Sequence, residues 1–172
     1  AVTGYITEYM GAAHISSALK KIYKHANFYY DMECFFDYRN IKENLIIIGG
    51  PVNNPITRRL FQEVDIPYEF DGFSLINKRT KKTFDAVIND YIELDYALVV
   101  NCKNPFNGSS KKRCILIAGC RTLGCYAGAQ FLTENVRELK VGNHENYAFV
   151  VKIHGHSYSA IGEPKLMEME YF

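Results

Sequence analysis

The sequence predicts an α/β fold of Rossmann-like type, with three layers, a mostly parallel sheet and a small antiparallel β insertion. Three observations favour this fold class. Apolar runs rich in β-branched residues alternate with helical patterns toward both ends of the chain, which is typical of parallel sheets covered by helices. Two such runs, residues 45–48 and 114–118, are each followed by a glycine-rich turn and the start of a helix. Between them, short apolar stretches separated by polar turns indicate antiparallel hairpins.

The composition is that of one globular domain spanning residues 1–172, with 48% hydrophobic and 23% charged residues. With 20 basic and 19 acidic residues the net charge is +1, which disfavours nucleic acid or an anionic membrane as a partner. The apolar runs are too short to span a membrane, and no secretory signal is visible. Because the chain starts at Ala1 without a methionine, we expect a processed protein or a domain cut from a longer one.

The five cysteines indicate a reducing compartment rather than a framework of disulfides. Their number is odd and no Cys-x-x-Cys pair occurs. Cys114 lies inside an apolar run, where a cysteine behaves as a small hydrophobic residue. We therefore expect a cytoplasmic protein.

The first part of the chain predicts two helices and two strands. Residues 14–25 have apolar side chains at i, i+3, i+4 and i+7, which indicates a helix. The aromatic stretch 28–36 predicts a strand, and the run 45–48 predicts a buried strand. Residues 56–64 predict a short helix that begins after a proline and that Asn54 can cap.

The second part predicts mostly strands. In chain order the expected elements are short antiparallel strands at 68–70, 73–76, 83–87 and 91–94, buried strands at 96–101 and 114–118, a helix at 122–134, a core strand at 147–153 and an edge strand in the tail to residue 172. The segment after residue 101 has two interpretations. If it follows a parallel strand, Phe106 can stack on a ligand ring beside the glycine turns. The Asn107-Gly108 dipeptide instead favours a hairpin into residue 114, which we prefer.

The two glycine-rich turns predict a ligand site at the carboxyl ends of their strands. Glycine lets backbone N–H groups approach a ligand, and a helix N-terminus favours an anion. Arg121 adds positive charge, Thr122 suits a helix cap, and Asn53 and Asn54 suit a ribose or a base edge. The spacings of the P-loop and the dinucleotide fingerprint are missing, so the alternative is that the glycines only allow close packing. The predicted ligand-binding residues are Gly50, Asn53, Asn54, Thr57, Arg58, Gly119, Arg121, Thr122 and Gly124.

Other chemical groups give weaker indications. Cys120 precedes a helix, where a thiol pKa can fall, but Tyr126 stands where a Cys-x5-Arg phosphatase loop has its arginine. His154 and His156 face the same side of a strand without an evident third ligand, so no metal site is expected. The basic cluster within residues 78–82 is interpreted as a solvated hairpin tip rather than a phosphate or nucleic-acid contact.

Three motifs resemble those of a loose group of uncharacterised prokaryotic Rossmann-like domains. They are Gly-Gly-Pro-x-x-Asn-x-x-Thr at 49–57, Asn-Pro-Phe-Asn at 104–107, and a strand ending in Ala-Gly at 118–119 that leads into a glycine-containing helix start. Cys125 replaces the threonine that is usual in that helix start. The resemblance covers residues 41–135; it implies a Rossmann-like fold and the place of the site, and it implies no particular reaction.

Together the motifs favour a sensory or regulatory domain that binds a small anionic ligand, either a nucleotide or an NAD-derived molecule. No resident cofactor is expected, and a companion domain or a homo-oligomer is compatible with this function. Two alternatives stay open. One is a nucleotide or N-glycosyl hydrolase that uses a carboxylate not identified from the sequence, so whether the chain is an enzyme is undecided. The other is a protein-interaction scaffold without a small-molecule ligand.

Overall fold

The computed structural model describes residues 13, 15–17, 20, 44–106, 111–139, 145–156 and 159–172. The predicted strand at 28–36 lies outside the described residues, and so does most of the predicted helix at 14–25. Within that predicted helix, the Ile15 side chain is described and is buried.

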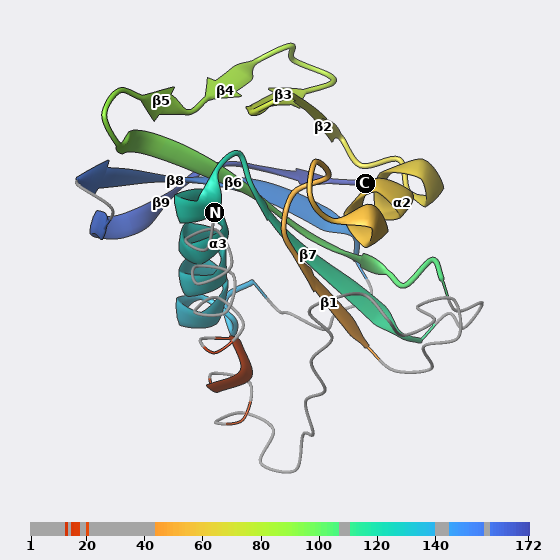
Figure 1. Cartoon of the computed structure of the whole chain (residues 1–172). Helices are drawn as coiled ribbons and strands as arrows, with labels where there is room; N and C mark the ends of the chain where they lie inside the picture. The colour runs from red at the N-terminus through yellow and green to blue at the C-terminus, as the bar shows by residue number, and fades with distance from the viewer. Residues whose placement is uncertain are drawn as a thin grey trace.

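The described strands form two sheets (Figure 1). The main sheet consists of β1 (Leu45–Ile48), β5 (Val87–Ile88), β6 (Ile92–Lys103), β7 (Arg113–Gly119), β8 (Tyr147–His156) and β9 (Ser159–Tyr171). Its order is β1-β7-β6-β8-β9, and β5 pairs with the start of β6. The small sheet consists of β2 (Tyr68–Asp71), β3 (Ser74–Asn77) and β4 (Thr83–Asp85), in the order β2-β3-β4. The two helices whose bounds the structure describes are α2 (Pro55–Glu63) and α3 (Thr122–Glu134).

The prediction of a Rossmann-like, mostly parallel sheet is wrong. Among the described strands only β1 and β7 run parallel, and every other pair is antiparallel. The reason is that β6 returns directly into β7 as a hairpin, in which the Asn104 N–H donates to the Lys112 carbonyl over 2.9 Å. Helix α3 does connect β7 to β8, as in a βαβ unit, but β6 lies between these two strands and runs the opposite way. The described part of the chain is therefore mostly β, with one mixed sheet and one antiparallel sheet.

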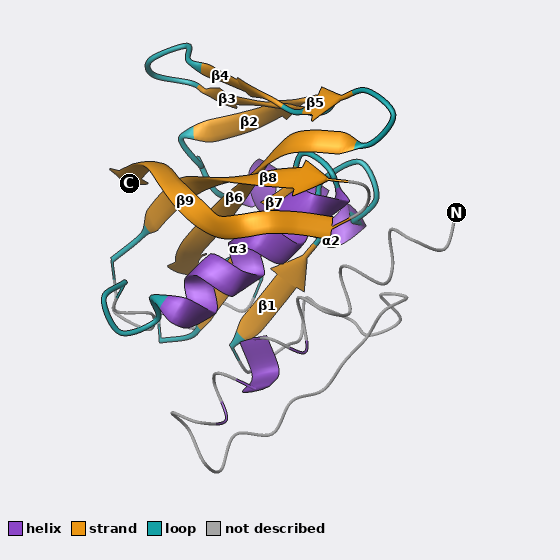
Figure 2. Cartoon of the chain, turned by 90° about the vertical axis from the view of Figure 1, so that its left-hand side faces the viewer, coloured by secondary structure: helices purple, strands orange, loops and turns teal. Residues whose placement is uncertain are grey.

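Each face of the main sheet is covered by a different layer (Figure 2). Helix α3 packs on one face, against β6, β7 and β8. The other face is covered by the small sheet and by α2. Neighbouring residues of β7 consequently face different cores: Ile115 and Ile117 belong to the core under α3, and Cys114 and Leu116 to the core under the small sheet. Burial on both faces explains why these strands are continuous apolar runs in the sequence.

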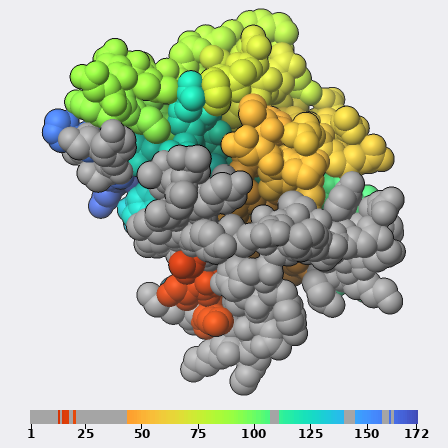
Figure 3. Space-filling view, viewed as in Figure 1, coloured from red at the N-terminus to blue at the C-terminus, as the bar shows by residue number. Residues whose placement is uncertain are grey.

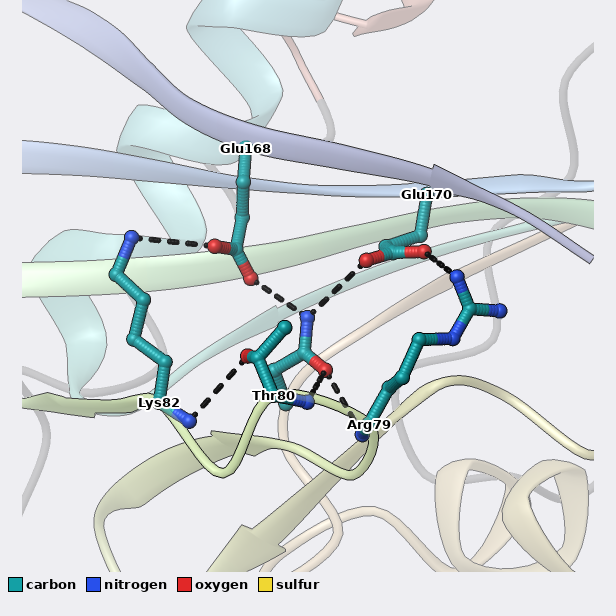
Figure 4. Close-up of polar contacts among 6 residues, drawn as sticks. Arg79, Thr80, Lys82, Glu168 and Glu170 are labelled. Carbon is teal, nitrogen blue, oxygen red and sulfur yellow. Dashed lines mark hydrogen bonds and ion pairs between the residues drawn. The ribbon is translucent and has the colours of Figure 1, made fainter.

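A group of polar side chains fastens the small sheet to β9 (Figure 4). At its centre is Asn77, which is fully buried and whose amide donates to Glu168 over 2.9 Å and to Glu170 over 3.4 Å. Arg79 and Lys82 pair with the same two carboxylates, at 2.8 Å to Glu170 and 3.1 Å to Glu168. Two members of the basic cluster predicted to be a solvated hairpin tip therefore hold the small sheet in place.

Replacing Asn77 with alanine should destabilise the fold by about 1 to 2 kcal/mol, because the groups bonded to the buried amide lose their partner. The Asn77 oxygen also accepts from the N–H groups of Arg79 at 2.9 Å and Thr80 at 3.0 Å, so the turn loses its internal acceptor. The measurement is urea unfolding followed by circular dichroism, since the chain has no tryptophan. The matched control is Arg79→Ala, whose exposed ion pair should contribute less than about 1 kcal/mol. Equal losses in the two variants would contradict a central role for Asn77.

Candidate functional site

The two glycine-rich turns lie side by side at one end of the main sheet. They follow β1 and β7, the one parallel pair among the described strands, so the carboxyl ends of both strands meet there. The Gly49 N–H donates to the Ile117 carbonyl over 2.9 Å. A Cβ added to Gly50 would lie 3.3 Å from the Gly119 carbonyl oxygen. In the space-filling view the orange surface of the first turn adjoins the teal surface of the second (Figure 3).

In the first turn, three of the predicted ligand contacts hold the turn itself. The Asn54 side chain caps α2 by accepting from the N–H groups of Ile56 and Thr57, at 2.9 and 3.3 Å. The Thr57 hydroxyl is buried and donates to the Gly49 carbonyl over 2.8 Å. The Arg58 guanidinium donates to the carbonyl oxygens of Pro51 and Val52. The Asn53 side chain, by contrast, is exposed at the tip.

In the second turn, the glycines allow α3 to begin against the backbone of β6. A Cβ on Gly124 would lie 2.2 Å from the Tyr96 carbonyl oxygen, and a Cβ on Gly119 would lie 2.2 Å from the Arg121 carbonyl oxygen. Real Cβ atoms do not approach backbone atoms so closely, so both positions require glycine. The helix cap also differs from the prediction, because Arg121 is the N-cap residue and Thr122 is the first residue of α3.

The N-terminus of α3 already holds a carboxylate, that of Asp95, which was not among the residues predicted from the sequence. Asp95 is fully buried in β6. One oxygen accepts from the N–H groups of Tyr96 at 2.8 Å and Arg121 at 3.0 Å, and the other accepts from the Gly124 N–H at 2.5 Å. Backbone N–H groups and the helix dipole do attract an anion here, but that anion belongs to the protein itself.

The acid–base properties of this region follow from its burial. Burial raises the pKa of Asp95 to about 6, although the hydrogen bonds from Gly124, Tyr96 and Arg121 and the Arg121 charge act in the opposite direction. Burial also raises the pKa of the Cys120 thiol well above its usual range, with the Asp95 charge adding to the effect. Cys120 therefore stays a thiol at neutral pH and lacks the character of an activated nucleophile.

Arg121 and Phe73 form a contact between the second turn and the small sheet. The guanidinium carbon of Arg121 lies 3.2 Å from the centroid of the Phe73 ring, which is close stacking of a cation on an aromatic face. The Arg121 Nε is buried and has no hydrogen-bond partner among the described residues. Phe73 is 46% exposed, so its ring is partly open to solvent beside the guanidinium. Because Phe73 belongs to the β2–β3 turn, no local sequence pattern connects it with Arg121.

The two histidines singled out in the sequence are exposed at the end of β8, where Gly155 between them lies against Leu123 in the first turn of α3. The His156 ring nitrogen Nδ1 is 3.1 Å from the Tyr91 hydroxyl, and the two rings meet edge to face. Among the residues that the structure describes, no three His, Cys, Asp or Glu side chains are grouped so that they could hold a metal ion. No helix in the described ranges is both long and apolar enough to cross a membrane.

None of the protein-family models, curated proteins or solved structures compared with the chain matches it. The comparisons therefore give no information on function, and the geometry of the two turns is the starting point for the proposal below.

Proposed function

We propose that the chain is a binding module for a small anionic ligand, which it contacts chiefly through Arg121 at the junction of the two turns. The observation that supports this most is the state of the Arg121 side chain. Its guanidinium is stacked on Phe73, and its Nε has no hydrogen-bond partner within the described part of the chain. A planar guanidinium held in this way is suited to a phosphate or carboxylate, which accept two parallel hydrogen bonds from it.

The position of Asp95 changes which groups would contact the ligand. The Asp95 carboxylate accepts hydrogen bonds from the backbone N–H groups of Arg121 and Gly124. These two donors are therefore not available to a second anion. The proposed contacts are therefore the exposed or half-exposed members of the predicted set that do not hold a turn in shape: Gly50, Asn53, Arg121 and Thr122. Asn54, Thr57, Arg58, Gly119 and Gly124 would act indirectly, by fixing the shapes of the turns.

Binding is favoured over hydrolysis by the burial of the reactive groups. Asp95, whose pKa of about 6 would suit a general acid or base, is fully buried, and both of its oxygens accept hydrogen bonds from the backbone. The Cys120 thiol is buried and its pKa is raised. Neither group is presented to an external substrate.

A thermal-shift screen with inorganic phosphate, common nucleotides, cyclic nucleotides, NAD and ADP-ribose should raise the melting temperature with at least one compound. A ligand at 100 times its dissociation constant adds about 2.7 kcal/mol of stability. The shift should disappear in Arg121→Ala and weaken in Arg121→Lys, because lysine lacks the planar pair of donors. The matched control is Arg59→Ala, which removes an arginine paired with Glu63 on the exposed side of α2.

Three results would contradict the proposal in different ways. No shift with any compound, in a folded protein, would favour a protein-interaction scaffold. A shift that persists in Arg121→Ala would place the ligand elsewhere on the chain. Release of nicotinamide, a free base or phosphate during incubation would show that the chain is a hydrolase.

A further inference from the structure

Cys102 and Cys114 lie directly opposite each other on the antiparallel strands β6 and β7. Their side chains consequently point to the same face of the sheet, in the core under the small sheet. Both residues are fully buried, and neither takes part in a disulfide.

The position of the pair in the ladder matches the span of a disulfide. In an antiparallel ladder, hydrogen-bonded and non-hydrogen-bonded pairs alternate. The Asn104 N–H donates to the opposite Lys112 carbonyl, so the pair two residues further along, Cys102 and Cys114, is also a hydrogen-bonded pair. Opposite Cα atoms of such pairs are about 5.5 Å apart, inside the range of roughly 4.4 to 6.8 Å that disulfides span.

We propose that Cys102 and Cys114 form a redox-sensitive pair that a peroxide converts into a cross-strand disulfide. A single buried cysteine is explained as a small apolar residue, whereas these two cysteines lie opposite each other with Cα atoms already within the span of a disulfide. Their Cβ atoms, about 5 Å apart at such a pair, must approach by about 1 Å for the bond to close. The disulfide would tie β6 to β7, the strands that hold Asp95 and Gly119 of the candidate site. Its formation does not depend on the proposed ligand.

The electrostatics distinguish the two sulfurs. The hydrogen bond from the Cys114 thiol, aided by the Arg113 charge, lowers the pKa of Cys102 despite its burial, whereas the pKa of Cys114 is raised. Either sulfur can be the first to react, and Cys102 is the one whose pKa is lowered. Its thiolate displaces hydroxide from hydrogen peroxide and becomes a sulfenic acid. The Cys114 sulfur then attacks the Cys102 sulfur, the S–O bond breaks, and the departing oxygen leaves as water. In sum, two thiols and one peroxide give one disulfide and two waters, and two electrons pass from sulfur to oxygen.

Because both sulfurs are buried, peroxide reaches them only through a local opening of the fold. The backbone pairs nearest to them at the end of the β6–β7 hairpin are Lys103 with Arg113 and Asn104 with Lys112. We therefore expect oxidation of the folded protein to be slower than that of the same thiols in urea.

The test is to treat the full chain with millimolar hydrogen peroxide, block free thiols and digest with trypsin. The expected product is peptide 83–103, which contains Cys102, linked to peptide 114–121, which contains Cys114. The intact mass falls by about 2 Da, for two hydrogens, and dithiothreitol restores it. Closing this loop should also raise the melting temperature by about 5 °C.

Variants assign the linkage to the proposed pair. Peptide 114–121 also contains Cys120, so the digest is repeated with Cys120→Ala, which should keep the linked peptides. Cys102→Ser and Cys114→Ser should each abolish the linkage, and Cys125→Ser should not. A linkage through Cys34, Cys120 or Cys125 would overturn the proposal. Complete blocking of Cys102 and Cys114 after peroxide treatment and unfolding would overturn it as well.

Discussion

Replacing Gly124 with alanine should destabilise the fold by about 3 kcal/mol or more, which is a large loss for the addition of a single methyl group. The new Cβ would lie 2.2 Å from the Tyr96 carbonyl oxygen and 2.9 Å from its carbon. Both atoms belong to the backbone of β6, which cannot rotate away as a side chain can. The start of α3 would have to shift, and the hydrogen bond from the Gly124 N–H to Asp95 would be lost with it.

Gly128→Ala is the matched control, one turn further along the same helix. Alanine is a better helix former than glycine by about 1 kcal/mol at both positions, so propensity cancels in the comparison. At Gly128 the new Cβ would meet side-chain atoms instead, at 2.9 Å from Ile117 and 3.1 Å from Ala97. We expect a loss of at most about 1 to 2 kcal/mol there. If urea unfolding gives similar free energies of unfolding for Gly124→Ala and Gly128→Ala, the start of α3 can shift without a loss of stability, which contradicts the prediction.

Between pH 4.5 and 7.5, the wild-type protein should lose about 2 kcal/mol more stability than an Asp95→Asn variant. Burial raises the pKa of Asp95 to about 6 in the folded protein, above the value of 3.8 expected for an exposed aspartate. The folded state therefore binds the proton more tightly. The resulting stabilisation is complete below pH 3.8 and is lost as the pH rises through 6. Asparagine does not titrate, so the variant lacks this contribution.

Urea titrations at each pH give the free energies of unfolding of the wild-type protein and of Asp95→Asn. The contributions of the other titrating groups cancel when the two values are subtracted. Chemical shifts of the Asp95 carboxyl carbon give its pKa independently. A difference of the opposite sign would mean that the hydrogen bonds from Tyr96, Arg121 and Gly124 outweigh the cost of burying the charge. The pKa of Asp95 would then lie below 3.8 instead of near 6.

Hydrophobic patterns located most of the described strands but did not reveal their directions. The run at 45–48 coincides with β1, and the preference for a hairpin after residue 101 is confirmed by the Asn104–Lys112 hydrogen bond. Strands buried on both faces are continuous apolar runs whether their neighbours are parallel or antiparallel, so the apolar runs alone left the orientation open. The predicted hairpin makes β6 antiparallel to β7, and the predicted helix between β7 and β8 allows those two strands to be parallel. Taken together, these two predictions are compatible with β6 lying between β7 and β8, as the structure has it.

The sequence indicated where the two glycine turns meet, but it did not indicate which charged groups lie there. Two glycine turns after apolar strands indicated where the strand ends meet, and the structure does bring Gly50 and Gly119 together. Asp95 interrupts an apolar stretch, and for that reason two strands were predicted where the structure has the single strand β6 with a buried acid. The stacking of Phe73 on Arg121 joins residues far apart in the chain, which no local pattern can indicate.

The parallel pairing of β1 with β7 has a consequence for how the chain folds. Leu45 lies opposite Cys114, so this pairing encloses α2, the small sheet and the β6 strand within one long loop of chain. The β6–β7 and β8–β9 pairings join segments that are close in sequence and cost little loop-closure entropy. Contacts of low sequence separation form early, whereas distant parallel pairings form late. The β6–β7 and β8–β9 hairpins are therefore expected to form first, and β1, on arriving, brings the first glycine turn against the second.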